Sequence, residues 1–151
     1  MNKALNYIGL AKKAGSVEIG ETDTGAAVRA GKGRLLVLAS DASDNARHRA
    51  ENFVYGTQTP IITLPYTKEE LSLITGKGGC SMAAFTDIGL ATAFAEALAE
   101  EKPDYKETAE QLARKNEKMQ MRKREAQAHE RNLKKGKAAG PTAMGKRRRN
   151  I

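Results

Sequence analysis

The sequence predicts an α/β protein: a three-layer α/β/α sandwich with a mixed sheet, followed by a charged tail that is helical or disordered. Short apolar runs alternate with helix-periodic segments over the first 100 of the 151 residues. The run at residues 35–39 is apolar throughout, as in a strand that helices cover on both faces. Past Pro103, large apolar side chains become sparse and basic ones accumulate.

The first part of the chain predicts two helices around one short strand. Apolar residues at helical spacing indicate a first helix that ends at Gly15, a residue suited to a C-terminal cap. An alternating run predicts a strand over residues 17–19. A second helix follows over about 22–30, which Gly25 weakens and Gly31 ends.

The middle of the chain continues the alternation. After the buried strand at 35–39, apolar spacing predicts a helix that ends at Gly56, and residues 61–64 form the next strand. Thr67 and Glu70 have the spacing of a capping box, which predicts the start of a short helix.

A glycine-rich loop at residues 76–80 separates this short helix from a last strand at 81–86. Asp87 is placed to cap the final helix of the sandwich, whose apolar face extends to Leu98. We therefore expect residues 1–100 to form one domain that folds alone, because that length suffices for a single core.

Charge is strongly polarised along the chain. Residues 1–100 carry 10 basic and 11 acidic side chains, a net charge of −1, whereas residues 101–151 carry 16 and 7, a net charge of +9. We call residues 101–151 the basic tail and expect a helix to about residue 133, then disorder. Such a tail is typical of a segment that binds nucleic-acid phosphates without sequence specificity.

The alternative is a charged helix that is only solvated. A membrane-surface helix is disfavoured because the tail lacks Trp and Phe. The expected phosphate contacts are Arg122, Lys123, Arg124, Lys134, Lys135, Lys146, Arg147, Arg148 and Arg149.

Composition excludes several classes of protein. No stretch is apolar for long enough to span a membrane, and the N-terminus lacks a signal-peptide pattern, so we expect a cytoplasmic location. The single cysteine, Cys80, cannot form an internal disulfide, and His48 and His129 add no ligand cluster. We therefore expect no metal, no cofactor and no membrane partner.

The helix start after Gly20 is a candidate site for phosphates or base edges. Backbone N–H groups at a helix N-terminus can donate to such groups, and glycine permits close approach. Arg29, Lys32 and Arg34 lie on or just after this helix and add positive charge. The alternative is an ordinary capped helix with scattered surface charge.

Other polar features give weaker indications. The loop at residues 76–79 lacks the spacing of a phosphate-binding loop and precedes a strand. We therefore interpret it as a flexible loop that adapts its conformation to a ligand. Asp41 and Asp87 follow predicted strands, where α/β enzymes place catalytic groups, but no catalytic set converges with them. Cys80 has no local histidine that would activate it. We therefore expect a protein that is not an enzyme.

Several strings in the first 99 residues together point to one family. The strings are 8–15 (IGLAKKAG), 20–22 (GET), 27–43 (AVRAGKGRLLVLASDAS), 59–61 (TPI) and 68–71 (KEEL) leading to Gly76. With these strings the sequence resembles the kink-turn RNA-binding ribosomal proteins named for archaeal L-seven-Ae, which include eukaryotic L-thirty-e, and within them a small bacterial ribosome-associated branch. The resemblance covers about residues 3–99 and leaves out the tail.

The resemblance implies an α/β/α sandwich that binds RNA without catalysis. In the family, three segments meet at one edge of the sandwich, and here they correspond to residues 20–26, 40–43 and 76–81. Bent RNA exposes base edges that such a surface can read. The site residues implied by these segments are Gly20, Glu21, Thr22, Asp23, Ala26, Ser40, Asp41, Ala42, Gly76, Lys77, Gly78, Gly79, Cys80 and Ser81.

The sequence departs from the family at its main motif. The strongly RNA-reading members have Gly-x-Asn-Glu-x-x-Lys, where this chain has Gly20, Thr22, Asp23 and Ala26, so the motif lysine is absent. We expect RNA affinity with relaxed kink-turn specificity in a monomer that works on the ribosome or in its assembly, with ribosomal or another structured RNA as partner. The alternative is a protein-interaction adaptor whose tail alone contacts nucleic acid.

Overall fold

The computed structural model describes residues 2–78 and 80–139, with side chains through Leu133. Contacts divide the chain into two compact units, Met1–Arg114 and Lys115–Ile151. The first unit contains the sheet and the helices that cover it. The second contains the continuation of the last helix.

A four-stranded mixed sheet forms the middle layer of the first unit. Its strands are β1 (Val17–Ile19), β2 (Leu35–Leu38), β3 (Ile61–Thr63) and β4 (Met82–Phe85), in the order β1-β4-β2-β3. Strand β4 runs antiparallel to both of its neighbours, and β2 pairs in parallel with β3. The sheet is therefore mixed, as the sequence predicted.

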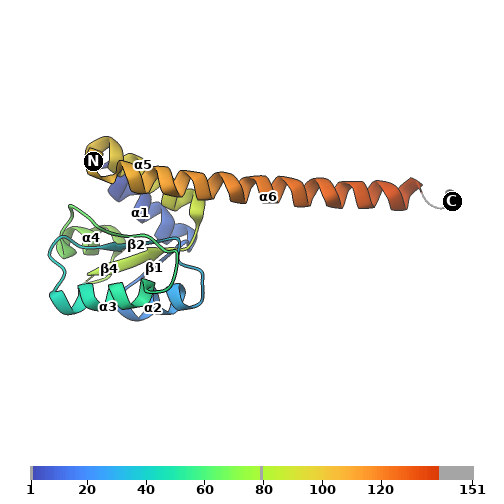
Figure 1. Ribbon diagram of the computed structural model, residues 1–151. Coiled ribbons are helices and arrows are strands. Elements are labelled where there is room, and N and C mark those ends of the chain that lie inside the picture. The colour runs from blue at the N-terminus through green and yellow to red at the C-terminus, as the bar shows by residue number, and fades with distance from the viewer. Residues whose placement is uncertain (1, 79, 140–151) are drawn as a thin grey trace. The chain divides into compact units, whose positions relative to one another are not determined.

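Helices cover both faces of this sheet (Figure 1). The outer layers are α1 (Lys3–Ala14), α4 (Lys68–Thr75) and α5 (Ile88–Glu101) on one face, and α2 (Glu21–Arg29) and α3 (Asp44–Val54) on the other. This arrangement confirms the predicted three-layer α/β/α sandwich. Its physical cause is that apolar strands buried on both faces require a helical layer on each side.

The core lies where the two central strands meet the helices. Every residue of β2 and β4 is buried, which explains why neither strand alternates apolar with polar residues. Phe85 of β4 packs against Phe94 of α5, with ring centroids 4.9 Å apart. These two aromatic side chains join the sheet to the α5 layer.

Local signals in the sequence set the helix ends. Gly15 follows α1 in the left-handed conformation, with φ of 71°, as a C-terminal cap requires. Thr67 and Glu70 form the predicted capping box at α4. Asp87 accepts a hydrogen bond from the Leu90 N–H and so caps α5. Each of these local predictions is confirmed.

The first unit continues past the end of the sandwich helices. A short 3-10 helix, η1 (Pro103–Tyr105), leads into α6 (Lys106–Ala139). Ala109 and Leu112, in the first two turns of α6, are buried. The Tyr105 hydroxyl donates to the Thr63 carbonyl at 2.5 Å. The predicted boundary at residue 100 followed composition, whereas the contacts of the compact unit extend to Arg114.

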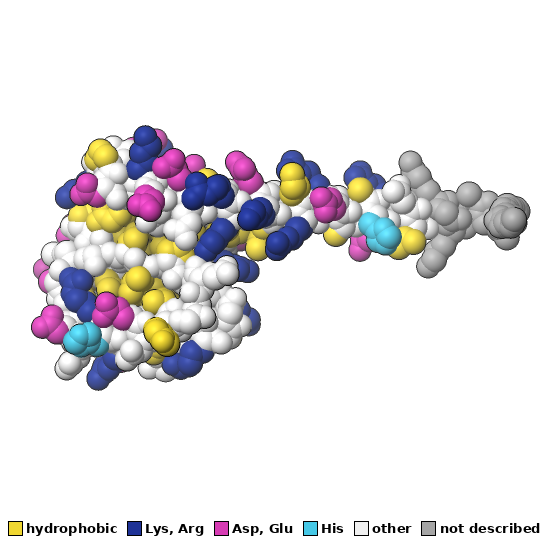
Figure 2. All heavy atoms as spheres, in the orientation of Figure 1, with side chains coloured by type: hydrophobic (Ala, Val, Ile, Leu, Met, Phe, Trp, Pro, Cys, Tyr) yellow, Lys and Arg dark blue, Asp and Glu magenta, His cyan; other side chains and the backbone are white. Residues whose placement is uncertain are grey.

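The second unit is helical through Ala139, beyond the helix end predicted at about residue 133. Lys and Arg side chains crowd the surface of α6 (Figure 2), and Arg122, Lys123 and Arg124 are exposed. Lys134 and Lys135 lie in the helix. The other four expected phosphate contacts, Lys146, Arg147, Arg148 and Arg149, lie outside the described residues.

Among the described residues, every helix is too short or too polar to traverse a lipid bilayer. The same residues contain no group of three or more His, Cys, Asp and Glu side chains arranged to hold a metal ion.

Candidate functional site

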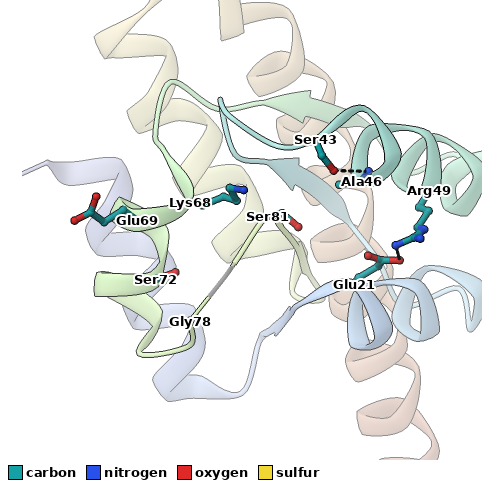
Figure 3. Close-up of a pocket in the computed structure, with 9 residues that line it drawn as sticks. All are labelled: Glu21, Ser43, Ala46, Arg49, Lys68, Glu69, Ser72, Gly78 and Ser81. Atoms are coloured by element: carbon teal, nitrogen blue, oxygen red, sulfur yellow. Dashed lines mark hydrogen bonds and ion pairs between the residues drawn. The ribbon is translucent and has the colours of Figure 1, made fainter.

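An open cleft of about 440 Å³ lies at one edge of the sandwich. It joins the three predicted segments: Glu21 comes from the first, Ser43 from the second, and Gly78 and Ser81 from the third (Figure 3). The walls between them are the first two turns of α3 and of α4. The remaining lining residues are Ala46, Arg49, Lys68, Glu69 and Ser72.

The first segment is the turn from β1 into α2. Gly20 has φ of 95°, a conformation that side-chain-bearing residues rarely adopt, and its N–H donates to the Met82 carbonyl at 3.1 Å. Because glycine has no side chain to cap the helix, the first N–H groups of α2 receive no cap from this position. Buried Thr24 anchors the turn by donating its hydroxyl to the Glu18 carbonyl at 3.4 Å.

The second segment connects β2 to α3 and is fixed by two caps. The Asp41 carboxylate accepts a hydrogen bond from the Lys68 N–H at 2.8 Å, which ties this turn to the start of α4. Ser43 caps α3 by accepting from the Ala46 N–H at 3.1 Å. Ala42 is buried and presents no side chain to the cleft. Asp41 and Asp87, considered above as catalytic carboxylates, therefore both serve as helix-capping acceptors.

The third segment leads from α4 into β4. Gly76 ends α4 with φ of 75°, and the Cys80 N–H donates to the Ser72 hydroxyl at 3.3 Å. The Cys80 side chain is buried, and this burial raises the pKa of its thiol. Lys77 and Gly78 are exposed, so this loop offers them and its backbone to a ligand. Gly79 lies outside the described residues.

Two basic side chains that the sequence analysis did not single out lie on the walls of the cleft. Arg49 of α3 forms an ion pair with Glu21, with 2.7 Å between Nη1 and Oε1. Lys68 extends into the cleft from the opposite wall, while Glu69 points away from it (Figure 3). The sequence signal was the spacing of Ser43, Ala46 and Arg49, which places the three residues near one face of α3.

The positive residues at the other end of α2 do not join this cleft. Arg29 places its guanidinium 5.3 Å from the centre of the Phe53 ring, a cation–π contact. The backbone N–H of Arg34 donates to the Phe85 carbonyl at 2.7 Å, which places this residue beside the end of β4. Lys32 is exposed in the turn between them. Nine residues of helix, about 13 Å, separate the two ends of α2.

The motif positions of α2 lie beside the cleft but not in its lining. Thr22, Asp23 and Ala26 are all exposed, so their side chains remain accessible from solvent. Ser40 is also exposed, and its carbonyl accepts a hydrogen bond from Arg47 at 3.3 Å. The structure therefore brings together one residue or more from each of the three segments, with Arg49 and Lys68 added.

Comparisons with known proteins give one curated relative and a set of structural neighbours. The chain is 33% identical to the RNA-binding protein YlxQ of Enterococcus faecium over 75 residues, which are 50% of this chain and 72% of that protein. No model of a protein family matches the chain.

The structural neighbours share the fold. A protein of unknown function from Bacillus halodurans superposes with a TM-score of 0.60 at 24% identity, covering 65% of this chain and 98% of that one. The 15.5kD RNA binding protein of Giardia lamblia superposes with a TM-score of 0.51 at 17% identity, covering 64% and 82%. At these identities the likeness concerns the fold alone.

Proposed function

This chain belongs to the family of the RNA-binding protein YlxQ, which is of L-seven-Ae type, and we propose on that basis that it is a non-catalytic RNA-binding protein. The cleft at the edge of the sandwich docks on bent or looped RNA. The observation that carries this proposal is the convergence of the three loop segments on that one cleft.

The chemistry of the cleft suits RNA better than a small metabolite. It is open, and its lining includes hydroxyl groups, two acidic residues and two basic residues. Hydroxyls such as those of Ser43 and Ser81 can exchange hydrogen bonds with base edges, which bent RNA exposes. The segment that carries Ser43 is fixed by hydrogen bonds to the first turns of α3 and α4, so this part of the surface is preorganised.

The basic tail supplies affinity in this proposal. Its cations neutralise phosphates and release counterions, which strengthens binding to any nucleic acid and makes that binding depend on salt. An exposed cluster such as Arg122–Arg124 has few aromatic neighbours for base stacking, so it adds little selectivity. Structured ribosomal RNA, on the ribosome or during its assembly, is the partner we propose.

The test compares the full chain with a chain that ends at Arg114, the last residue of the first compact unit. Each is titrated with a kink-turn RNA, a plain hairpin RNA and duplex DNA at two salt concentrations, after calorimetry has shown that both are folded. The shorter chain should retain a preference for the bent RNA. The full chain should bind all three more tightly, with a salt slope steeper by about 0.7–0.9 for each additional phosphate contact.

A folded chain ending at Arg114 that binds no RNA would refute docking by the sandwich and would leave the adaptor interpretation. A second arm tests the orientation of α2. Because Ala26 is exposed on that helix, Ala26→Lys should tighten binding to the kink-turn RNA more than to the hairpin. Equal affinities before and after the substitution would mean that α2 does not face the RNA.

A further inference from the structure

Arg49 occupies a position in the cleft that packing alone does not explain. It projects from α3 toward the first turn of α2, where its Nη1 lies 2.7 Å from the Glu21 carboxylate. The side chain of Arg49 is 56% exposed and that of Glu21 is 35% exposed. An ion pair with this much solvent around it contributes little to stability, so it can be exchanged for another partner.

The contact between α2 and α3 has other supports. The ring of Phe53 packs so closely on Gly25 that a Cβ there would lie 2.7 Å from the ring. Arg29 lies over the same ring from the end of α2. Since these contacts already join the two helices, the Glu21–Arg49 pair is not needed to hold them together.

The guanidinium of Arg49 retains donors for a ligand. It has five N–H donors in a planar fork, and Glu21 accepts from Nη1. Among the described residues, no other hydrogen bond of this guanidinium is seen. The planar fork matches the oxygens of a phosphate diester, which can accept two parallel hydrogen bonds.

The charges around the cleft favour an anionic group at this point. Lys68 on the opposite wall has the same sign as Arg49, and Glu69 points away from the space between them (Figure 3). The Asp41 carboxylate is already occupied by the Lys68 N–H. Glu21 is therefore the carboxylate that competes with a ligand for Arg49.

We propose that Arg49 binds a backbone phosphate of the RNA seated in the cleft, and that its guanidinium changes partner from Glu21 to that phosphate on binding. This inference rests on the proposed function. In the free protein, Glu21 holds the guanidinium beside the cleft and opposes its transfer to the ligand. The cation of the site thus comes from α3, whereas the motif position on α2 is occupied by Ala26.

The experiment titrates the full chain and four variants with the kink-turn RNA over a range of salt concentrations. Arg49→Gln should weaken binding about tenfold and reduce the salt slope by roughly one phosphate contact. Glu21→Gln removes the competing carboxylate and should tighten binding by about twofold or more. Lys32→Gln removes the same charge at the far end of α2 and serves as the matched control, with an expected change below about twofold.

Arg49→Lys separates charge from geometry. It keeps the positive charge but loses the planar fork, so its affinity should lie between those of the wild type and Arg49→Gln. Melting temperatures of all variants verify that each is folded.

Equal losses of affinity in Glu21→Gln and Arg49→Gln would overturn the inference, because they would mean that the ion pair itself is what the site requires. An Arg49→Gln variant that binds like the wild type, or loses no more than Lys32→Gln, would also overturn it. In both cases the wild type still binds RNA and the proposed function stands. If the wild-type chain binds no RNA, it is the proposed function that fails.

Discussion

Replacing Leu112 by alanine should destabilise the sandwich, although this residue lies beyond the 100 residues that the composition marks as the domain. Leu112 has 0% of its surface exposed, and Ala109, one turn earlier, has 6%. The Thr92 hydroxyl donates to the Leu112 carbonyl at 3.2 Å, a bond to the backbone that the substitution leaves in place. The variant therefore isolates side-chain packing at the start of α6.

The expected loss is that of a fully buried leucine. Removing three side-chain carbons from a closed core costs the transfer free energy of those atoms and the energy of the cavity they leave, together about 2–5 kcal/mol. For a unit of this size each kcal/mol lowers the melting temperature by roughly 3–5 °C, so we expect a decrease of about 6–25 °C.

Scanning calorimetry of the full chain measures this effect, because it follows the cooperative core directly. Leu133→Ala is the matched control: it makes the same chemical change at a side chain that is 55% exposed in the second unit. Its melting temperature should stay within about 2 °C of the wild type, as for other surface substitutions. Similar shifts in the two variants would refute the conclusion that the start of α6 completes the core.

Two further substitutions test particular contacts. A change from glycine to alanine ordinarily stabilises a helix, but in Gly25→Ala the new Cβ would lie 2.7 Å from the Phe53 ring. Urea unfolding should therefore show a net decrease of roughly 1 kcal/mol in the free energy of unfolding. An increase would contradict the close packing of α2 on α3. Burial and the hydrogen bond that its hydroxyl donates to Glu101 at 2.8 Å raise the pKa of Tyr66 above its ordinary 10.0. The folded state therefore keeps this proton while the unfolded chain loses it, and stability falls as pH rises above about 10. Tyr66→Phe should lower the free energy of unfolding by about 1 kcal/mol at neutral pH and should reduce the loss of stability above about pH 10. If the variant loses as much stability over the same pH range as the wild type, groups other than Tyr66 cause that loss.

Most of the sandwich could be predicted because its signals are local. The apolar run that becomes β2 indicates burial on both faces, and the capping box of Thr67 and Glu70 marks the start of α4. Such signals depend on residues a few positions apart. The extent of the first unit was harder to predict, because Leu112 stands among charged residues and only its contact with α5 shows that it is buried.

The candidate site shows the same division. The three loop segments could be identified from family resemblance, and the structure places a residue or more of each in one cleft. The separation of Arg29 and Lys32 from that cleft could not be predicted from the sequence, because it depends on which end of α2 faces the loops. Arg49 was missed for a related reason: its partner Glu21 is 28 positions away in the sequence.

The sequence by itself determined the order of helices and strands in the sandwich, the caps at several of their ends and the accumulation of positive charge in the tail. These properties follow from periodicity, capping and composition, each of which acts over a few residues. The tertiary structure alone decided which residues of those loops line the cleft, which helix provides its arginine and how far the core extends into α6. Those outcomes depend on contacts between residues distant in sequence, and such contacts exist only once the helices have packed on the sheet.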